Sequence, residues 1–282
     1  MNANRSNPLL VTGATGYVGG RLVPLLLESG YRVRAMARSV DKLTCRHWTG
    51  HPNVEIVSGD ALDTESLTRA AEGCWAIYYL VHSMGGPHEQ FADRDRRAAD
   101  NLVVAANRAG ADRIIYLGGL GEEDGGLSEH LRSRHEVARI LQAGPVPATH
   151  LRAGMILGSG SASFEILRYL VDRMPVMMTP RWVNKACQPI AIRNVLNYLT
   201  GCLEHQETVG KTFDIGGPDV LTYRELMDIY AEEAHLPKRL MIPGPFITTG
   251  ISAYWIHLIS PVPVSLTVPL TMGFRNSLIC MD

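Results

Sequence analysis

Apolar runs of strand length alternate with longer segments of helical periodicity through the first half of the chain. The expected strands cover 8–12, 31–37, 54–57, 75–81, 113–117 and 149–152. Helical spacing of apolar residues predicts helices between them, at 18–29, 64–72, 89–109 and 129–142. Parallel strands need crossover connections, so this alternation indicates an α/β fold with a parallel sheet. Right-handed crossovers then give a doubly wound sheet with helices on both faces.

A glycine-rich turn links the first expected strand to the first expected helix. It carries Gly13, Gly16 and Gly19 in a G-x-x-G-x-x-G spacing. Gly13 suits a tight turn, Gly16 lets the backbone approach a pyrophosphate, and Gly19 allows the helix to pack closely on the sheet. The helix N-terminus presents free N–H groups and a positive dipole end to phosphates. We therefore expect a Rossmann-type dinucleotide site, to which the turn also contributes Thr15, Tyr17 and Val18.

The residue that closes the second expected strand indicates which dinucleotide binds. An acidic residue at this place bonds the ribose 2′-hydroxyl of NAD, but here the residue is Arg38. A guanidinium suits a 2′-phosphate, so we expect NADP(H) to be preferred over NAD(H). The alternative is that Arg38 only stacks over the adenine, which NAD also allows.

Further cofactor contacts are expected where the third and fourth strands end. Asp60 either accepts a hydrogen bond from the adenine amino group or caps a turn, and both interpretations stay open. Ala61 and Val81 are expected along the same site. His82 follows the fourth strand, where the loops of such a fold meet the cofactor. It either contacts the ligand or caps the loop.

Several later segments share a pattern with one protein family. They are 81–85 (Val-His-Ser-Met-Gly), 130–134 (His-Leu-Arg-Ser-Arg), 151–154 (Leu-Arg-Ala-Gly), 180–183 (Pro-Arg-Trp-Val) and 216–223 (Gly-Gly-Pro-Asp-Val-Leu-Thr-Tyr). Together with the glycine turn, they resemble the atypical, extended-like branch of the short-chain dehydrogenase/reductase superfamily, with its NmrA-like and bacterial YbjT-like proteins. The resemblance covers essentially the whole chain and implies an NAD(P)-binding oxidoreductase fold. It places Gly154 where superfamily members wrap the nicotinamide; the alternative is a turn glycine.

The chain departs from this family at the catalytic positions. Active members use a Tyr-x-x-x-Lys pair on one helix face and a serine at the end of the preceding strand. Here His130 and Arg134 stand at the tyrosine and lysine positions, and 117–120 (Leu-Gly-Gly-Leu) holds no hydroxyl. An imidazole has an ordinary pKa of about 6.5, so His130 could deliver a proton near neutrality and is the catalytic candidate. Otherwise His130 is an ordinary polar residue of a first helical turn, and Arg134 is expected to contact the cofactor.

Composition narrows the function classes. The formal net charge is −1, from 27 basic and 28 acidic residues, so we expect no nucleic-acid partner. The basic run 94–97 is short, has acidic neighbours and predicts a solvated helix face. The five cysteines contain no C-x-x-C pair, which indicates a reducing, cytoplasmic environment. Cys45, His47 and His51 lack an acidic fourth ligand, so no metal site is expected.

The pattern changes after residue 155. We expect a dinucleotide-binding domain over 1–155 and a dependent smaller α/β lobe over 156–282, which holds a substrate or a partner. Within this lobe the sequence predicts helices at 163–172, 193–204 and 222–234, and a strand at 212–215.

One segment near the end of the sequence, 241–274, contains no Asp, Glu, Lys or Arg. It includes an apolar helical stripe, Ile251–Ile259, and Pro261, Pro263 and Pro269 are expected to break any helix after the stripe. The stripe is too short to span a bilayer, so no transmembrane segment is expected. It forms a lid over the cleft, a partner surface or a membrane-surface patch, and the lack of basic residues argues against the last. YbjT-like proteins commonly continue into a further C-terminal domain, so the resemblance implies that the stripe meets such a domain, missing after residue 282, or a second subunit.

These features leave three functions open. The first is an NADP(H)-binding oxidoreductase that acts on a carbonyl or quinone-like small molecule. The absence of the usual Ser, Tyr and Lys favours a second function, a non-catalytic NAD(P)-sensing regulatory module of NmrA type. The uncharged segment favours a third, an assembly role in which the nucleotide is structural.

Overall fold

A seven-stranded sheet runs through the larger part of the structure, a computed structural model that describes residues 6–82, 88–121, 127–244 and 256–281. Its strands are β1 (Leu9–Thr12), β2 (Val33–Ala37), β3 (Val54–Ser58), β4 (Ala76–Tyr79), β5 (Arg113–Gly119), β6 (Ala148–Ala153) and β11 (Thr212–Ile215). They stand in the order β11-β6-β5-β4-β1-β2-β3, and every neighbouring pair is parallel. The order reverses between β1 and β4, which confirms the predicted doubly wound, Rossmann-type sheet.

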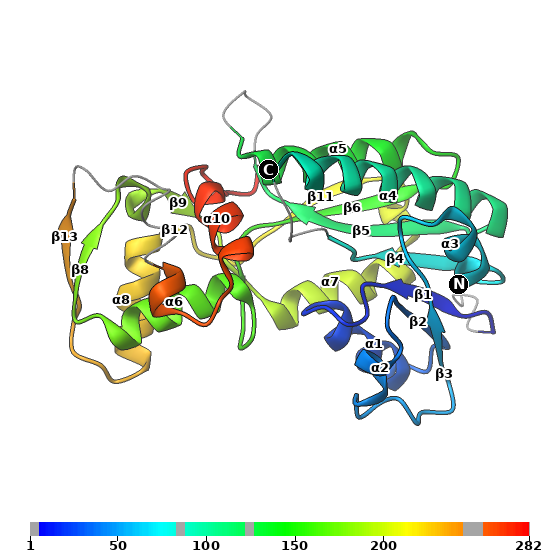
Figure 1. Cartoon of the computed structure of the whole chain (residues 1–282), viewed down its shortest axis with the longest axis horizontal. Coiled ribbons are helices and arrows are strands. Elements are labelled where there is room, and N and C mark those ends of the chain that lie inside the picture. Colours follow the sequence, from blue (N-terminus) through cyan, green and yellow to red (C-terminus); the bar gives the residue numbers. More distant parts are fainter. Residues whose placement is uncertain (1–5, 83–87, 122–126, 245–255, 282) are drawn as a thin grey trace.

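Helices cover both faces of this sheet (Figure 1). One face carries α1 (Gly19–Glu28), α2 (Asp41–Thr44) and α7 (Ile192–Glu204), and the other carries α3 (Thr64–Ala71), α4 (His88–Ala109) and α5 (Glu129–Ala143). Side chains alternate along a strand, so Leu9 and Val11 join the core shared with α1 while Leu10 joins the core shared with α4. Both faces are buried, which explains the unbroken apolar run of β4.

The strand predicted at 212–215 is present, but its expected place in the smaller lobe is wrong. β11 extends the central sheet, with Thr212–Ile215 in parallel register against His150–Ala153 of β6. The buried Val195 and Leu199 of α7 belong to the core on one face of the same sheet. The spacing of apolar residues can predict a strand but not the strand with which it pairs. For this reason the sequence alone assigned β11 to the wrong part of the molecule. The chain leaves the sheet after β6 and returns to it, so the two-domain division at residue 155 stays a prediction.

The smaller lobe lies beyond one end of the sheet (Figure 1). It contains α6 (Ala162–Arg173), α8 (Tyr223–Glu233), α10 (Val264–Gly273) and the 3-10 turn η1 (Arg181–Asn184), and a second such turn, η2 (Gln206–Thr208), follows α7. Its short strands pair as β7 (Ile156–Leu157) with β10 (Ile190–Ala191), β9 (Ala186–Cys187) with β12 (Leu221–Thr222), and β8 (Val176–Thr179) with β13 (Leu240–Pro243). Trp182, Tyr223 and Phe274 pack with ring centroids 4.7–5.5 Å apart and join η1, α8 and the residue after α10 in one core.

Of the three prolines expected to break a helix, Pro269 does not do so, whereas Pro261 lies in the bend that follows the helical residues 256–259. Pro263 directly precedes α10, where its φ of −65° suits a helix start, and Pro269 lies inside the helix. A proline removes only its own N–H bond, and α10 continues past that loss to Gly273.

The Ile251–Ile259 stripe falls partly outside the described residues, since Ile251, Tyr254 and Trp255 are not among them. Ile256 is buried and Leu258 is exposed, so the partner surface expected there stays a prediction. Across the described residues, every helix lacks the length or the apolar content needed to cross a membrane.

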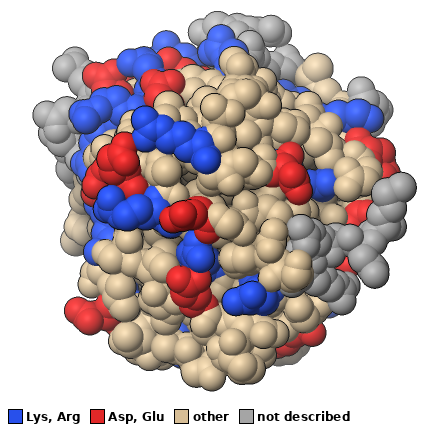
Figure 2. Space-filling model, turned by 90° about the vertical axis from the view of Figure 1, so that its right-hand side faces the viewer, with Lys and Arg blue, Asp and Glu red and all other residues tan. Residues whose placement is uncertain are grey.

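Charged side chains of both signs mix on the side of the molecule where β3 and α3 lie (Figure 2). Arg34 pairs with Glu55 at 2.7 Å, and Arg108 pairs with Glu65 at 2.7 Å. Neighbouring charges of opposite sign cancel at a distance, so the described residues of this face present no continuous basic stripe to a polyanion.

We expect α7 to stabilise the sheet, because the Tyr78 hydroxyl of β4 donates to the Leu199 carbonyl at 2.9 Å and the Leu199 side chain is fully buried. Leu199→Ala should lower the free energy of unfolding in urea by about 2–5 kcal/mol. Tyr198→Ala on the same helix is the control: Tyr198 is 48% exposed, so its loss should cost about 0.5 kcal/mol or less. Equal losses in the two variants would contradict the placement of α7.

Candidate functional site

Two adjoining cavities open where β1 and β4 end and the strand order reverses. Both are lined by Gly13, Gly16, Leu80 and His82. One extends along the ends of β2 and β3 and is named the β2 cavity here; the other extends along β5 and β6 and is named the β5 cavity. Ligands of doubly wound sheets bind at this switch point, outside the carboxyl ends of the strands.

The turn after β1 packs directly against the chain that leaves β4. Gly13 has a φ of +71°, and a Cβ there would lie 2.6 Å from the Leu80 carbonyl oxygen. Only glycine meets both conditions. The spacing predicted that Gly19 lets the helix pack closely on the sheet. The structure shows a different close contact: a Cβ at Gly19 would clash with the Gly13 carbonyl, so Gly19 lets α1 approach the turn itself. Among the described residues no side chain caps the N-terminus of α1. The N–H groups of Gly20, Arg21 and Leu22 donate to turn carbonyls, so this end of the helix offers the cavities mainly the positive end of its dipole.

The residues predicted for the adenosine end of a dinucleotide line the β2 cavity. They are Thr15, Arg38, Asp60, Ala61 and Val81. Arg38 is exposed at the end of β2 and pairs with no acidic residue in the described part of the chain. Asp60 Oδ1 accepts a hydrogen bond from the Leu62 N–H at 3.0 Å, so Asp60 holds the turn after β3 and also lines the cavity. Both interpretations of Asp60 therefore have a structural basis.

Two residues of α4 join the site although the sequence predicts a solvated face for 94–97. That prediction is right for Arg96 and Arg97, which are exposed, and wrong for the two residues before them: Arg94 lines the β2 cavity, and Asp95 is only 4% exposed. Asp95 stands three residues before the buried Ala98, on the helix face that packs against the sheet. The helical spacing between Asp95 and Ala98 could have predicted that Asp95 is buried. The prediction relied instead on the many charged residues of the run.

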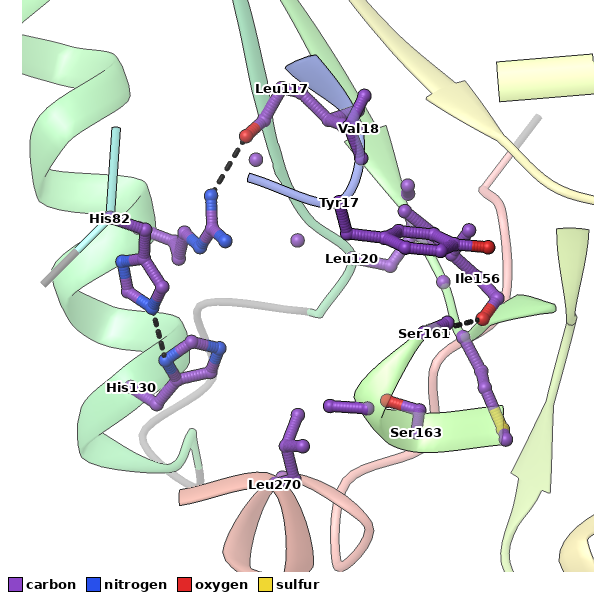
Figure 3. Close-up of a pocket in the computed structure, with 18 of the residues that line it drawn as sticks. Tyr17, Val18, His82, Leu117, Leu120, His130, Ile156, Ser161, Ser163 and Leu270 are labelled. Carbon is purple, nitrogen blue, oxygen red and sulfur yellow. Dashed lines mark hydrogen bonds between the residues drawn. The ribbon is translucent and has the colours of Figure 1, made fainter. Parts of the chain in front are cut away.

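The β5 cavity is largely apolar and reaches into the smaller lobe (Figure 3). Its apolar walls include Leu120, Leu131, Met155, Leu270 and Phe274. Leu270 belongs to α10, so the uncharged segment reaches the cleft, while the role of the Ile251–Ile259 stripe stays a prediction. The sequence did not single out these wall residues, because their contribution depends on how the lobe folds over the sheet.

Two histidines form the polar part of the wall. His82 Nε2 lies 3.2 Å from His130 Nδ1, and His82 Nδ1 lies 3.1 Å from Oδ2 of Asp95. The Ser133 hydroxyl donates to the same carboxylate oxygen at 3.3 Å. Figure 3 shows the second ring nitrogen of His130 pointing away from His82 and into the cavity. Asp95, His82 and His130 thus form one hydrogen-bonded row that ends at the β5 cavity.

Burial keeps both imidazoles neutral. It lowers the pKa of His82 to about 4; the Arg134 guanidinium adds to this shift, and Asp95 opposes it. Burial, with help from His82 and Arg134, holds the pKa of His130 well below its ordinary value. The ordinary pKa on which the expectation for His130 was based does not hold in this environment, because the charged form is disfavoured there; the catalytic role of His130 itself stays a prediction.

Other predicted residues have structural roles at the same place. Arg134 lines the β5 cavity, and its Nη1 donates to the Leu117 carbonyl at 2.8 Å (Figure 3). The Tyr116 hydroxyl donates to the Arg134 carbonyl at 3.3 Å, so it is engaged in the structure. A Cβ at Gly154 would lie 2.5 Å from the Gln188 carbonyl oxygen, so Gly154 serves a tight approach between chain segments while it also lines the cavity.

Every residue predicted for the cofactor or for catalysis lines at least one of the two cavities. The β5 cavity includes Tyr17, Val18, Gly19, His130, Arg134 and Gly154. The structure thus brings together residues from the ends of β1 to β6, and their contacts with a ligand stay predictions.

Known proteins resemble the chain in sequence. A model of NAD(P)H-binding proteins matches residues 13–169, more than half of the chain. The (4-alkanoyl-5-oxo-2,5-dihydrofuran-3-yl)methyl phosphate reductase of Streptomyces griseus is 28% identical over 262 residues, which cover 90% of this chain and 82% of the relative. Subunit 9 of the NADH dehydrogenase (ubiquinone) 1 alpha subcomplex of Arabidopsis thaliana is 24% identical over 92% of this chain and 66% of the relative. The 3 beta-hydroxysteroid dehydrogenase/Delta 5-->4-isomerase of Mycobacterium tuberculosis is 33% identical over 117 residues, so the match spans 38% of this chain and only 30% of that relative.

Solved structures share the fold. Triphenylmethane reductase of Citrobacter sp., complexed with NADP(H), superposes with a TM-score of 0.75 at 21% identity, covering 98% of this chain and 92% of that one. An NADPH-dependent quinone oxidoreductase of Escherichia coli, complexed with NADPH, gives a TM-score of 0.74 at 17% identity, covering 95% of this chain and 88% of that one. At identities this low, the structural similarity establishes the fold alone. The match to the model of NAD(P)H-binding proteins establishes the family. The chain belongs to the NAD(P)H-binding family.

Proposed function

We propose that the protein is an NADP(H)-dependent reductase for an uncharged, largely apolar molecule with a carbonyl or quinone-like group. The observation that carries this proposal is the meeting of two unlike cavities at Gly13, Gly16, Leu80 and His82. One cavity offers arginine side chains and the other an apolar pocket with an imidazole in its wall. A dinucleotide has the same asymmetry, with phosphates toward one end and a reactive ring at the other.

The residues of the β2 cavity fit a phosphorylated dinucleotide. The turn at Gly13 leaves a space that a Cβ would fill, and the uncapped N-terminus of α1 would hold the pyrophosphate. Arg38 has no acidic partner among the described residues, and the buried Nε of Arg94 lacks a hydrogen-bond partner there. Both side chains line the cavity and would hold a 2′-phosphate, which supports NADP(H) over NAD(H). The bound dinucleotide supplies the hydride that no side chain of the protein can supply.

The β5 cavity favours a substrate without charge. Arg134 is the one fixed charge among its described lining residues, and that guanidinium already bonds the Leu117 carbonyl. Apolar walls exclude water, which strengthens the hydrogen bonds of the histidine row and orients an apolar substrate. His130 reaches into this space and is the proposed catalytic residue. The names of the Streptomyces, Citrobacter and Escherichia coli relatives, two reductases and a quinone oxidoreductase, support reductive chemistry.

A dinucleotide-sensing or assembly role is the alternative. The described stretch 117–120 offers no hydroxyl at the end of β5, and burial disfavours the positively charged, proton-donating form of both histidines at neutral pH. One relative is named as a subunit of mitochondrial NADH dehydrogenase. A protein of this kind would bind NADP(H) and show no turnover.

We also infer a cytoplasmic location and a partner for the uncharged segment. The sequence contains no C-x-x-C pair, which supports a reducing compartment. Leu258 is 76% exposed within an otherwise apolar stretch, which supports a second subunit or a further domain at this surface.

Arg38→Ala tests the choice of cofactor. Loss of charge-assisted bonds to a 2′-phosphate should raise the dissociation constant of NADPH by roughly 10- to 100-fold, corresponding to about 1.5–3 kcal/mol. NADH affinity should stay unchanged, because NADH has no 2′-phosphate. Arg32→Ala is the matched control, since Arg32 is an exposed arginine just before the opposite end of β2. Fluorescence titration measures both ligands, and an unchanged NADPH affinity in Arg38→Ala would exclude a 2′-phosphate contact.

Turnover distinguishes the reductase from the sensor. NADPH oxidation should accelerate with apolar quinones or aldehydes and not with anionic acceptors of similar size, because the described lining of the β5 cavity holds no free cation. The absorbance of NADPH follows the reaction across a panel of acceptors. Saturable NADPH binding with no turnover for any acceptor would favour the sensor.

Ser163→Trp tests whether the β5 cavity holds the substrate. Ser163 lines the lobe side of this cavity, away from the glycine turn (Figure 3). A bulky ring there should raise KM for the best acceptor by about tenfold or more, through steric exclusion of a group worth about 1.4 kcal/mol of binding. The dissociation constant of NADPH should stay as in the unmodified protein, and an unchanged KM would place the substrate elsewhere.

A further inference from the structure

Asp95, His82 and His130 connect a buried carboxylate to the β5 cavity through two imidazoles. We propose that this row fixes the tautomers of both histidines, so that Nε2 of His130 faces the cavity without a proton and accepts one from the substrate hydroxyl. In this arrangement His130 is the catalytic residue, and His82 and Asp95 are positioning residues that act through it. The proposal rests on the proposed reductase function, since it assigns the proton-handling group of that site.

Each hydrogen bond in the row has one donor and one acceptor, and only one assignment of donors and acceptors fits all of them. An ionised carboxylate only accepts, so Nδ1 of His82 carries the proton and donates to Asp95 Oδ2 at 3.1 Å. A neutral imidazole has one N–H, so Nε2 of His82 accepts from Nδ1–H of His130 at 3.2 Å. The same rule leaves a lone pair on Nε2 of His130, and this is the ring nitrogen that points into the cavity (Figure 3). The Ser133 hydroxyl donates to Asp95 Oδ2 at 3.3 Å and thereby holds the carboxylate in place.

A proton that enters the row crosses it without leaving a charge on either imidazole. The O–H bond of a substrate hydroxyl breaks as an N–H bond forms at Nε2 of His130, and Nδ1 of His130 releases its proton to Nε2 of His82. Nδ1 of His82 releases its proton to Asp95 Oδ2, which becomes a carboxylic acid. One proton enters at the cavity, one arrives on Asp95, and no electrons are exchanged. In the direction of carbonyl reduction the row starts with the proton on Asp95 and returns it through His82 and His130 to the alkoxide, and one proton from water restores the Asp95 carboxylic acid for each further turnover.

The surroundings favour neutral imidazoles. Arg134 on α5 opposes a second positive charge, and Asp95 on α4 is the one group that favours it. Burial raises the pKa of Tyr79 on β4 and of Tyr116 on β5, so both phenols stay uncharged. The sequence of α10 contains no charged residue. Because burial lowers the pKa of His82 to about 4, the unprotonated row exists above that pH and is lost as the pH falls through it.

Asp95→Asn tests the row without a change in side-chain size. An amide in place of the orienting carboxylate of a catalytic triad leaves the wrong imidazole tautomer, and we expect the same here. The new amide N–H donates to Nδ1 of His82, whose Nε2–H then donates to Nδ1 of His130. The proton of His130 consequently moves to Nε2, and the group that faces the cavity changes from acceptor to donor.

Long-range ¹H–¹⁵N NMR spectra of the histidine rings show which nitrogen carries the proton, with no need for turnover. We expect Nδ1–H on both His82 and His130 in the unmodified protein and Nε2–H on both in Asp95→Asn. Asp93→Asn is the matched control, because Asp93 lies on the same helix with a side chain that is 68% exposed and pairs with Arg96, so both tautomers should stay unchanged. Nε2–H on His130 in the unmodified protein, or unchanged tautomers in Asp95→Asn, would overturn the proposal.

Turnover gives a separate readout. Asp95→Asn should lower kcat for oxidation of the alcohol product by about 10²-fold or more while the dissociation constant of NADPH stays unchanged, because only the proton acceptor is lost. The unmodified protein should keep this kcat as the pH falls until it nears about 4. Full activity in Asp95→Asn would contradict the row even if the tautomers change. If no acceptor is turned over at all, the proposed function fails, whereas the NMR spectra still decide the tautomers.

Discussion

The approach of Gly13 to the Leu80 carbonyl is the contact on which the site depends. It brings the turn after β1 against the chain that leaves β4, at the one place where the strand order reverses. A side chain at Gly13 would separate these segments, and a side chain at Gly19 would push α1 away from the turn itself. The N-terminus of α1 has no side-chain cap beside the boundary between the two cavities, so the positive end of the helix dipole and the opening occur together.

Beyond this boundary the two sides of the site differ in polarity, and the difference depends on the segments that cover them. Two arginines, Arg38 and Arg94, line the β2 cavity. The lobe and α10 cover the β5 cavity with apolar side chains, and this desolvation lowers the pKa values of His82 and His130. The cover that excludes water therefore also determines the protonation state of the histidines, so structure and chemistry are coupled at this wall.

Local sequence patterns predicted much of the fold and of the site. They could not predict contacts between segments that are far apart in the sequence. The glycine spacing and the alternation of strands and helices indicated the sheet, the position of the site and the residues at the strand ends. The four residues of β11 show a strand pattern but do not identify β6 as their neighbour, and α7 was separated from the sheet for the same reason. Asp95 was grouped with a charged run although its helical phase places it in the core. The pKa values of the histidines depend on burial by distant segments, which no local pattern reports.

The central claim is that one dinucleotide spans both cavities and meets His130 at its reactive end. A crystal structure of the protein grown with NADPH tests it most directly. We expect density for the pyrophosphate at the Gly13–Gly19 turn, for the 2′-phosphate beside Arg38, and for the nicotinamide in the β5 cavity next to His130. A dinucleotide bound elsewhere, or a nicotinamide that lies outside the β5 cavity, would contradict it.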